Sequence, residues 1–376
     1  MNNITNTTTG LNDDQQMLAD SAIRYLERGY ADAQRIASTA HIHGCDPARW
    51  AEFAELGWLA LAIPEESGGL GGSLADFCVL AEQLGRGLVV EPVVAGAALA
   101  GMLLADLPPG ALQGSWLADL ASGAKRLAFA PWEQQARHQP AAVAMRADAN
   151  EGGWSLQGGK SLAPGAAGAD GFLLAARTGG GTLGLFLVER QARGLQVDAC
   201  ALYDGRHACA LRLEGVTDAS LLHEGSDDEI LQIINHALDR VTIAHAAETV
   251  GTMAQALDIT RDYVGTRKQF GRAIATNQVI QHRLVDLFVE IEEARSLVRA
   301  ASSAPTPRMA AACGAYISQA ARHVWEESIQ LHGAIGMTEE YTIGRYVRRL
   351  ALAASLYGDS HHHLSRLAAI SLGEPV

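Results

Sequence analysis

With 376 residues, 48% of them hydrophobic and 19% charged, the chain is long enough for two or three domains with apolar cores of their own, which excludes a disordered or fibrous protein. Its formal net charge of -13 repels polyanions, so we expect no nucleic-acid partner. The five cysteines show no Cys-x-x-Cys spacing, so we expect neither a disulfide framework nor a metal site.

The first 125 residues predict a helical domain. Apolar residues recur at spacings of three and four in LADSAIRYL and in LADFCVLAEQLGRGL, and the Gly-rich stretch LAIPEESGGLGG between them predicts a loop. The longest apolar stretch, residues 93–104, is shorter than the roughly 18 residues of a membrane span and predicts a buried helix. The polar, acidic N-terminus does not resemble a secretory signal, so we expect no membrane partner and a cytoplasmic protein.

Residues 126–226 predict a small β domain, because the period changes to two in AAVAMRA, FLLAARTGGGTLGLFLVE and ALRLEGV. From residue 227 to residue 376 helices return. A first apolar stripe from Ile230 runs to about Val264, where GTRKQFGRAIATN ends it. Further helices are predicted at 278–303, 308–331 and 342–356, and a last one begins near Ser360. The predicted fold class is therefore mainly α with a central β domain.

Three segments of the sequence can be compared with the motifs of one protein family. FAELGWLALAIPEESGGLGGS, with AEQLGRG and EP after it, resembles the N-terminal domain of acyl-CoA dehydrogenases. TRKQFGRAIATNQVIQHRLVD and IQLHGAIGMTEEYTIGRYVRR resemble two motifs of the same family's C-terminal domain. The resemblance covers most of the chain. It implies an N-terminal helical domain, a middle β-barrel or sandwich and a C-terminal four-helix bundle, with FAD between domains and subunits, an acyl-CoA substrate and an electron-transfer flavoprotein as partner.

The same resemblance implies a set of cofactor contacts. Arg267 would pair with the FAD pyrophosphate, since a guanidinium fork fits phosphate oxygens, and Phe270 would pack near the adenine. Positions that match contacts to the ADP moiety or the flavin are Gln278, Gln330, Gly333 and His361.

The half of the family's site that binds FAD within one subunit departs from the pattern. Where the family has a hydroxyl-bearing T-E-P-x-A-G-S-D stretch, this chain has LAFAPWEQQARHQPAA. The second flavin-facing stretch reads WSLQGGKSLAPGAAGAD, so its Thr-rich turn has become Ala, Pro and Gly. The resemblance therefore implies weakened flavin contacts within the subunit and retained contacts to a neighbour's FAD.

The family's catalytic glutamate is also replaced. An ungapped count puts Tyr357 at its position, and a phenol with a pKa near 10 is a poor general base at neutral pH. Two alternatives remain open. Asp239 precedes Arg240 in a pair that resembles the acid-Arg pair of some relatives, although Val241 is at the expected position. Asp359 is the second candidate, with helix capping as its competing role.

The tail LYGDSHHHLSRLA resembles small subunits from the bacterial degradation of steroid side chains, cyclic acids or dicarboxylic acids, which pair with a larger dehydrogenase chain. Its three adjacent histidines point in different directions on a helix and cannot chelate one ion. We expect an FAD-dependent acyl-CoA dehydrogenase in a homo-oligomer or a mixed oligomer. The alternatives are a non-catalytic subunit that completes a partner's FAD site and a flavin monooxygenase on the same fold.

Overall fold

The structure is a computed structural model that describes residues 10–30, 32–41, 43–136, 138–151, 153–338 and 340–374. It divides into two compact units. The bundle unit comprises Met1–Ala33, Leu74–Val89 and Thr242–Val376, and the sheet unit comprises Gln34–Ser73 and Val90–Val241. No described helix is both long and apolar enough to cross a bilayer.

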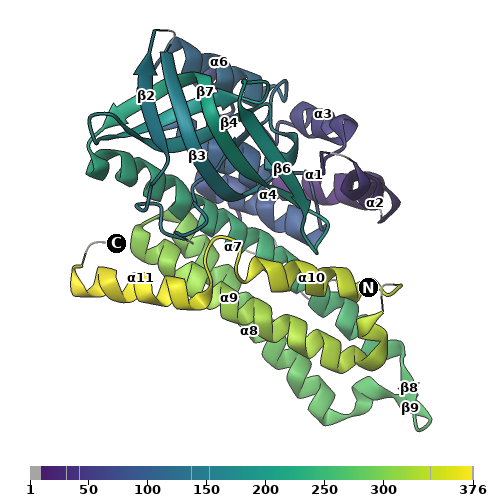
Figure 1. Cartoon of the computed structure of the whole chain (residues 1–376). Helices are drawn as coiled ribbons and strands as arrows, with labels where there is room; N and C mark the ends of the chain where they lie inside the picture. Colours follow the sequence, from purple (N-terminus) through teal and green to yellow (C-terminus); the bar gives the residue numbers. More distant parts are fainter. Residues whose placement is uncertain are drawn as a thin grey trace. The chain divides into compact units, whose positions relative to one another are not determined.

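The sheet unit is built on one sheet in the strand order β1-β4-β2-β3-β7-β5 (Figure 1). Because β5 also pairs with β4, the sheet closes on itself, and β6 extends it beside β7. Only the pairs of β4 with β1 and with β2 are parallel. The strands are β1 (Leu127–Phe129), β2 (Arg146–Asn150), β3 (Gly153–Pro164), β4 (Gly171–Thr178), β5 (Leu183–Glu189), β6 (Leu195–Ala201) and β7 (His207–Gly225).

Helices complete the sheet unit. The apolar stretch after Pro92 forms a π-helix that continues into α5, and its side chains are buried, which confirms the predicted buried helix. The helical elements of this unit are α2 (Asp32–Ala40), α3 (Pro47–Glu55), η1 (Glu65–Ser67), η2 (Val93–Ala100), α5 (Gly101–Ala105), α6 (Ala111–Ala121) and η3 (Ala166–Gly168).

One predicted strand is partly wrong. The period-two segment AAVAMRA enters the sheet only from Arg146 onward. The backbone N–H groups of Ala144 and Met145 instead donate to the carboxylate of Glu133, at 2.9 and 3.1 Å. A side chain from another segment thus takes the place of a neighbouring strand.

The bundle unit contains the long helices, at the predicted places. α8 and α9 lie side by side, and α10 and α11 pack on α9 (Figure 1). Helix starts follow from capping: Asn12 makes a capping box with Gln15, and Thr306 caps α9 before Pro307. The elements are α1 (Asp13–Gly29), α4 (Leu74–Arg86), α7 (Asp227–Thr266, of which residues 227–241 belong to the sheet unit), β8 (Lys268–Gln269), β9 (Arg272–Ala273), η4 (Ile274–Thr276), α8 (Gln278–Ser303), α9 (Pro307–His332), η5 (Gly333–Met337), α10 (Ile343–Ala353) and α11 (Ser360–Leu372).

Helices α4 and α7 cross at glycines. A Cβ placed on Gly85 would lie 1.8 Å from the carbonyl oxygen of Glu248, and one placed on Gly251 would lie 1.8 Å from that of Glu82. The hydroxyl of Thr252 donates to the carbonyl of Gly85 at 3.2 Å across the same contact. Only residues without a side chain allow two helix backbones to approach this closely.

Candidate functional site

The first candidate region is the hairpin that follows α7. Strands β8 and β9 pair from Lys268 to Ala273, and the turn between them places Phe270 at φ 51° and Gly271 at φ 81° (Figure 1). The Phe270 side chain is fully exposed, at 101% of its reference surface. A left-handed, fully exposed phenylalanine is unusual, because it combines backbone strain with an unburied ring.

Stacked aromatic rings place the motif around His332 beside the end of α7 that precedes the hairpin. The rings of Tyr263 and His332 stack with centroids 4.4 Å apart, and the Tyr263 hydroxyl donates to the His332 carbonyl at 3.2 Å. Gly333 follows at the end of α9 with a φ of 66°. Arg267 lies one turn after Tyr263, to whose carbonyl its N–H donates at 2.8 Å. The two motifs are thus adjacent although they are more than 60 residues apart in sequence.

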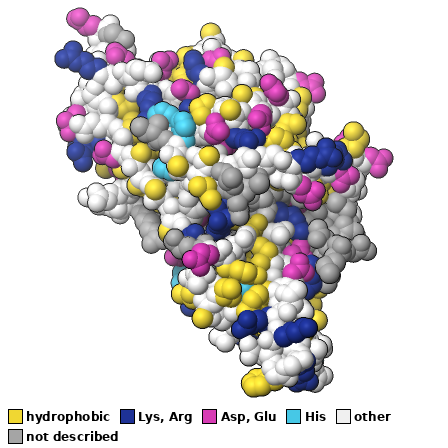
Figure 2. Space-filling model, turned by 90° about the vertical axis from the view of Figure 1, so that its right-hand side faces the viewer, with side chains coloured by type: hydrophobic (Ala, Val, Ile, Leu, Met, Phe, Trp, Pro, Cys, Tyr) yellow, Lys and Arg dark blue, Asp and Glu magenta, His cyan; other side chains and the backbone are white. Residues whose placement is uncertain are grey.

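This region presents cations to solvent. Arg267, Lys268 and Arg272 are exposed, and within the described part of the chain the guanidinium of Arg267 has no side-chain partner. Arg272 donates to the side chain of Asn277 at 2.7 Å, just before α8. At the lower tip of Figure 2, where Figure 1 places the hairpin, basic and hydrophobic side chains lie together. Exposed guanidinium groups beside an aromatic ring fit a diphosphate joined to an adenine.

Gln278 is the first residue of α8 and is exposed. Gln330 and Gly333, at the end of α9, are exposed as well. All five residues assigned to the ADP half of the cofactor therefore lie on the surface of the bundle unit. Residues retained for packing alone would be buried.

In the sheet unit, the two stretches that face flavin in the family pack against each other. The backbone N–H of Ser161 donates to the carbonyl of Trp132 at 2.9 Å. The ammonium of Lys160, whose side chain is fully buried, lies 2.8 Å from the carboxylate of Glu133. Burial lowers the pKa of Lys160, and the neighbouring Glu133 opposes that shift. Ala130 and Ala163 are fully buried beside these groups and bring no hydroxyl.

The two candidate bases lie on different elements. Asp239 is on the sheet-unit part of α7 and is 4% exposed. Its neighbour Arg240 forms an ion pair with Asp106 and also donates to the Met102 carbonyl at 3.1 Å. Arg240 thus links α7 to α5 and to Asp106, the residue that follows α5.

Asp359 is the N-cap of α11, where its carboxylate accepts from the N–H of His362 at 2.9 Å. This confirms the predicted capping role and leaves one carboxylate oxygen outside the cap bond. His361 is exposed in the first turn of α11, while His363 is buried. Among the described residues no three His, Cys, Asp or Glu side chains are arranged to hold a metal ion.

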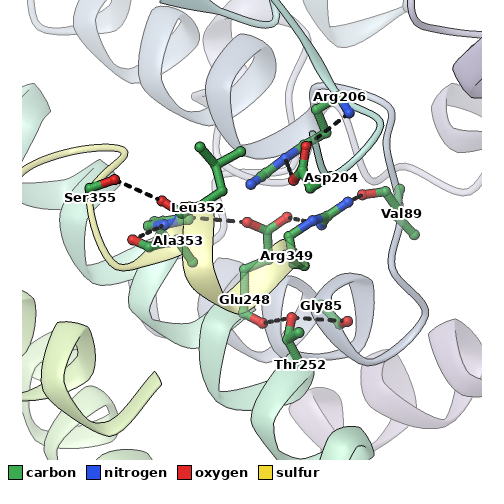
Figure 3. A network of polar contacts seen from close by, with 11 residues as sticks. Gly85, Val89, Asp204, Arg206, Glu248, Thr252, Arg349, Leu352, Ala353 and Ser355 are labelled. Atoms are coloured by element: carbon green, nitrogen blue, oxygen red, sulfur yellow. Dashed lines mark hydrogen bonds and ion pairs between the residues drawn. The ribbon is translucent and has the colours of Figure 1, made fainter. Parts of the chain in front are cut away.

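Tyr357 is 7% exposed, and its ring meets the ring of His245 edge to face with centroids 5.1 Å apart. His245 contacts Glu248 and Ala353 in a buried polar network that the sequence analysis missed, and Figure 3 labels both of these partners. Its Nδ1 lies 3.1 Å from the carboxylate of Glu248, and Arg349 lies 3.4 Å from the other oxygen of that group. The available signal was the interruption of the apolar stripe of α7 by a histidine and a glutamate three residues apart.

Comparisons with known proteins agree with this arrangement. The acyl-CoA dehydrogenase N-terminal domain matches residues 12–124, and the acyl-CoA dehydrogenase C-terminal domain matches residues 231–372. Acyl-CoA dehydrogenase IpdE2 of Mycobacterium tuberculosis is 30% identical over 94% of this chain and 96% of its own length. Benzylmalonyl-CoA dehydrogenase of Aromatoleum aromaticum is 28% identical over 90% of this chain and 92% of its own. A solved variant of the Tcur3481-Tcur3483 steroid ACAD is 29% identical, covers 96% of this chain and 98% of its own, and has a TM-score of 0.85.

The fold and these relatives define an oxidoreductase that acts on the CH–CH bond of an acyl-CoA thioester. The chain belongs to the acyl-CoA dehydrogenase family.

Proposed function

We propose that this chain works as one subunit of a mixed acyl-CoA dehydrogenase and holds the ADP half of FAD with its hairpin and the ends of α8 and α9. The observation that carries the proposal is the exposure of Arg267 and Phe270 next to Gly333. An exposed apolar ring with exposed cations beside it is typical of a surface that another molecule covers.

The residues of this chain fit that cofactor fragment. Arg267 supplies a two-pronged donor for the diphosphate, and Phe270 supplies a flat apolar face for the adenine. Gly333, with a positive φ and nothing within 4 Å of an added Cβ, leaves its backbone open to a close approach. When bound, FAD supplies the hydride acceptor for dehydrogenation of the acyl chain.

Contacts within the sheet unit support the proposal that this chain works beside a partner chain. The carboxylate of Glu133 is occupied by Lys160 and by two backbone N–H groups, so it has little capacity left for a flavin ring. The name of a related solved structure points the same way: the Tcur3481-Tcur3483 steroid ACAD is named for two chains. We therefore propose a homologous, larger chain as the partner, with an acyl-CoA substrate and an electron-transfer flavoprotein as electron acceptor.

For the base we propose Asp239, with Asp359 as the alternative. Asp239 is buried on α7, beside the Arg240 with which it forms the acid-Arg pair, and Asp359 accepts the bond that caps α11. Asp239→Asn should abolish exchange of the substrate's α-proton with solvent and leave FAD content unchanged. Asp359→Asn should change that exchange little. Equal loss in both variants, or in neither, contradicts the assignment.

A specific observation favours a second function. The buried tyrosine at position 357 stands where the family has its carboxylate, which suits a subunit that completes a partner's FAD site without catalysing. In that case Asp239→Asn would leave the turnover of the assembled oligomer intact, and a flavin site in the partner would carry all activity.

The cofactor contact is tested with Arg267→Ala in the assembled oligomer. Loss of a charge-assisted contact costs about 2–3 kcal/mol, which is roughly a 30- to 150-fold weaker affinity for FAD. Lysine should restore part of the affinity, because it keeps the charge without the paired geometry. FAD affinity is measured by flavin fluorescence during titration of the deflavinated protein.

The matched control is Arg193→Ala, which removes an exposed arginine from the loop between β5 and β6. It should leave the dissociation constant unchanged. If Arg267→Ala also retains wild-type affinity, the hairpin does not contact the cofactor, and the proposal fails.

A further inference from the structure

The network around His245 places ionisable groups inside the bundle unit. His245 and Glu248 lie three residues apart on α7 and are 6% and 5% exposed, and Arg349 on α10 is 1% exposed. Burying such groups is costly unless each has a hydrogen-bonded partner. The contacts of His245 therefore indicate what this side chain does in the network.

The contacts of His245 require a proton on Nε2. Nε2 lies 3.2 Å from the carbonyl oxygen of Ala353, which can only accept, so Nε2 carries a proton. Nδ1 lies 3.1 Å from a carboxylate oxygen of Glu248. Arg349 faces the other oxygen of Glu248 at 3.4 Å. Nε2 is therefore the donor that links His245 to the end of α10, and Nδ1 links it to Glu248.

Arg349 contacts the second carboxylate oxygen of Glu248 and also the backbone of another segment. Its second nitrogen donates to the carbonyl of Val89 at 3.0 Å (Figure 3). The carboxylate of Glu248 thus lies between His245 on its own helix and Arg349 on α10. Removing either partner would leave this buried group with one contact fewer.

His245 holds the end of α10. Ala353 is the last residue of that helix, where carbonyls lack partners within the helix. The next six residues, 354–359, carry Tyr357, which occupies the position of the family's carboxylate, and Asp359, a candidate base. The ring of Tyr357 contacts the ring of His245 edge to face. One side chain thus contacts both the residue before this segment and the middle of the segment.

We propose that His245 is a positioning residue that holds segment 354–359 in place through its Nε2 bond to Ala353. Its importance for turnover rests on the proposed function. The local clamping does not, and it is measured without substrate.

The hydrogen bond is tested by neutron crystallography of the deuterium-exchanged protein. The expected result is nuclear density for deuterium on Nε2 of His245, directed at the carbonyl of Ala353. A ring with deuterium on Nδ1 alone overturns the donation to Ala353.

The bond from His245 to Ala353 is tested by replacing His245 with two amide side chains of different length. In His245→Gln the amide nitrogen lies near the place of Nε2 and keeps the bond to Ala353, whereas in His245→Asn it lies near the place of Nδ1 and keeps only the bond to Glu248. Loss of one hydrogen bond of about 0.5–1.5 kcal/mol should speed amide exchange in residues 354–359 by about 2- to 12-fold in the Asn variant. The Gln variant should remain near wild type.

The control is His223→Asn, which by the same geometry removes the Nε2 contact of a His-carboxylate pair with Glu229 in the sheet unit. It should leave exchange in residues 354–359 unchanged. Equal exchange in the Gln and Asn variants of His245, whether fast or slow, overturns positioning through Nε2. If the assembled oligomer is active, His245→Asn should lower kcat with little change in KM. A chain that is inactive for other reasons still shows the exchange pattern, so the two proposals fail separately.

Discussion

The close crossing of α4 and α7 gives a stability prediction with a sign opposite to that expected from helix propensity. Replacing glycine by alanine inside a helix ordinarily stabilises it by about 0.8–1.0 kcal/mol. At Gly251 the new Cβ would lie 1.8 Å from the carbonyl oxygen of Glu82 and 3.0 Å from the backbone nitrogen of Arg86. Both contact atoms are backbone, so no side chain can rotate away, and the helices must separate.

The size of the loss follows from these two effects. Overpacking typically costs about 1–3 kcal/mol and occasionally more, and the rigid backbone contact puts Gly251→Ala at the upper end of that range. After the gain in propensity, a net loss of about 2 kcal/mol remains, which lowers the Tm of a unit of this size by about 4–8 °C. Gly85→Ala, on the opposite helix, should behave in the same way. The double variant should lose less than the sum, because the helices separate only once.

The assay is thermal unfolding followed by far-UV circular dichroism at fixed protein concentration. Gly265→Ala on the same helix is the matched control, because an added Cβ there meets nothing within 4 Å. It should be neutral or slightly stabilising. A Gly251→Ala protein that melts at or above the wild-type temperature would refute the close crossing.

Three further predictions concern other groups. Only Cys200 of the five thiols is exposed, while burial raises the pKa of Cys45, Cys209 and Cys313 to about 12, so Cys200→Ser should remove the fast reaction of the folded protein with a disulfide reagent. Glu133→Gln should destabilise the chain by about 3 kcal/mol in urea unfolding, because it leaves the buried Lys160 without its counter-ion, and Lys160→Met added to it should recover part of that loss. Burial lowers the pKa of His332, so on acidification from about pH 6.5 the unfolded chain takes up this proton first and stability falls; the pH dependence of unfolding should be shallower in His332→Asn, and an unchanged slope would contradict this.

Much of the fold was accessible from the sequence because helix and strand periods are local properties. The stripe from Ile230 onward predicted one long helix, and α7 extends to Thr266. The predicted helix at 278–303 has the bounds of α8. The strand predicted for AAVAMRA was partly wrong. The carboxylate of Glu133 takes the place of a strand partner there, and Glu133 comes from a segment outside the repeating pattern. The motif around Arg267 identified the family, since it depends on residue types at short spacings.

The tertiary structure alone decided which distant groups meet. Glu82 pairs with Arg295 across 213 residues, and Arg349 faces Glu248 across 101. No local pattern encodes such pairs, because they depend on how helices cross and how closely their backbones approach. An ungapped count predicted a tyrosine at the position of the family's carboxylate. Only the tertiary structure showed that the ring of His245 on α7 contacts this tyrosine and the last residue of α10, because those contacts join residues more than 100 positions apart in the chain.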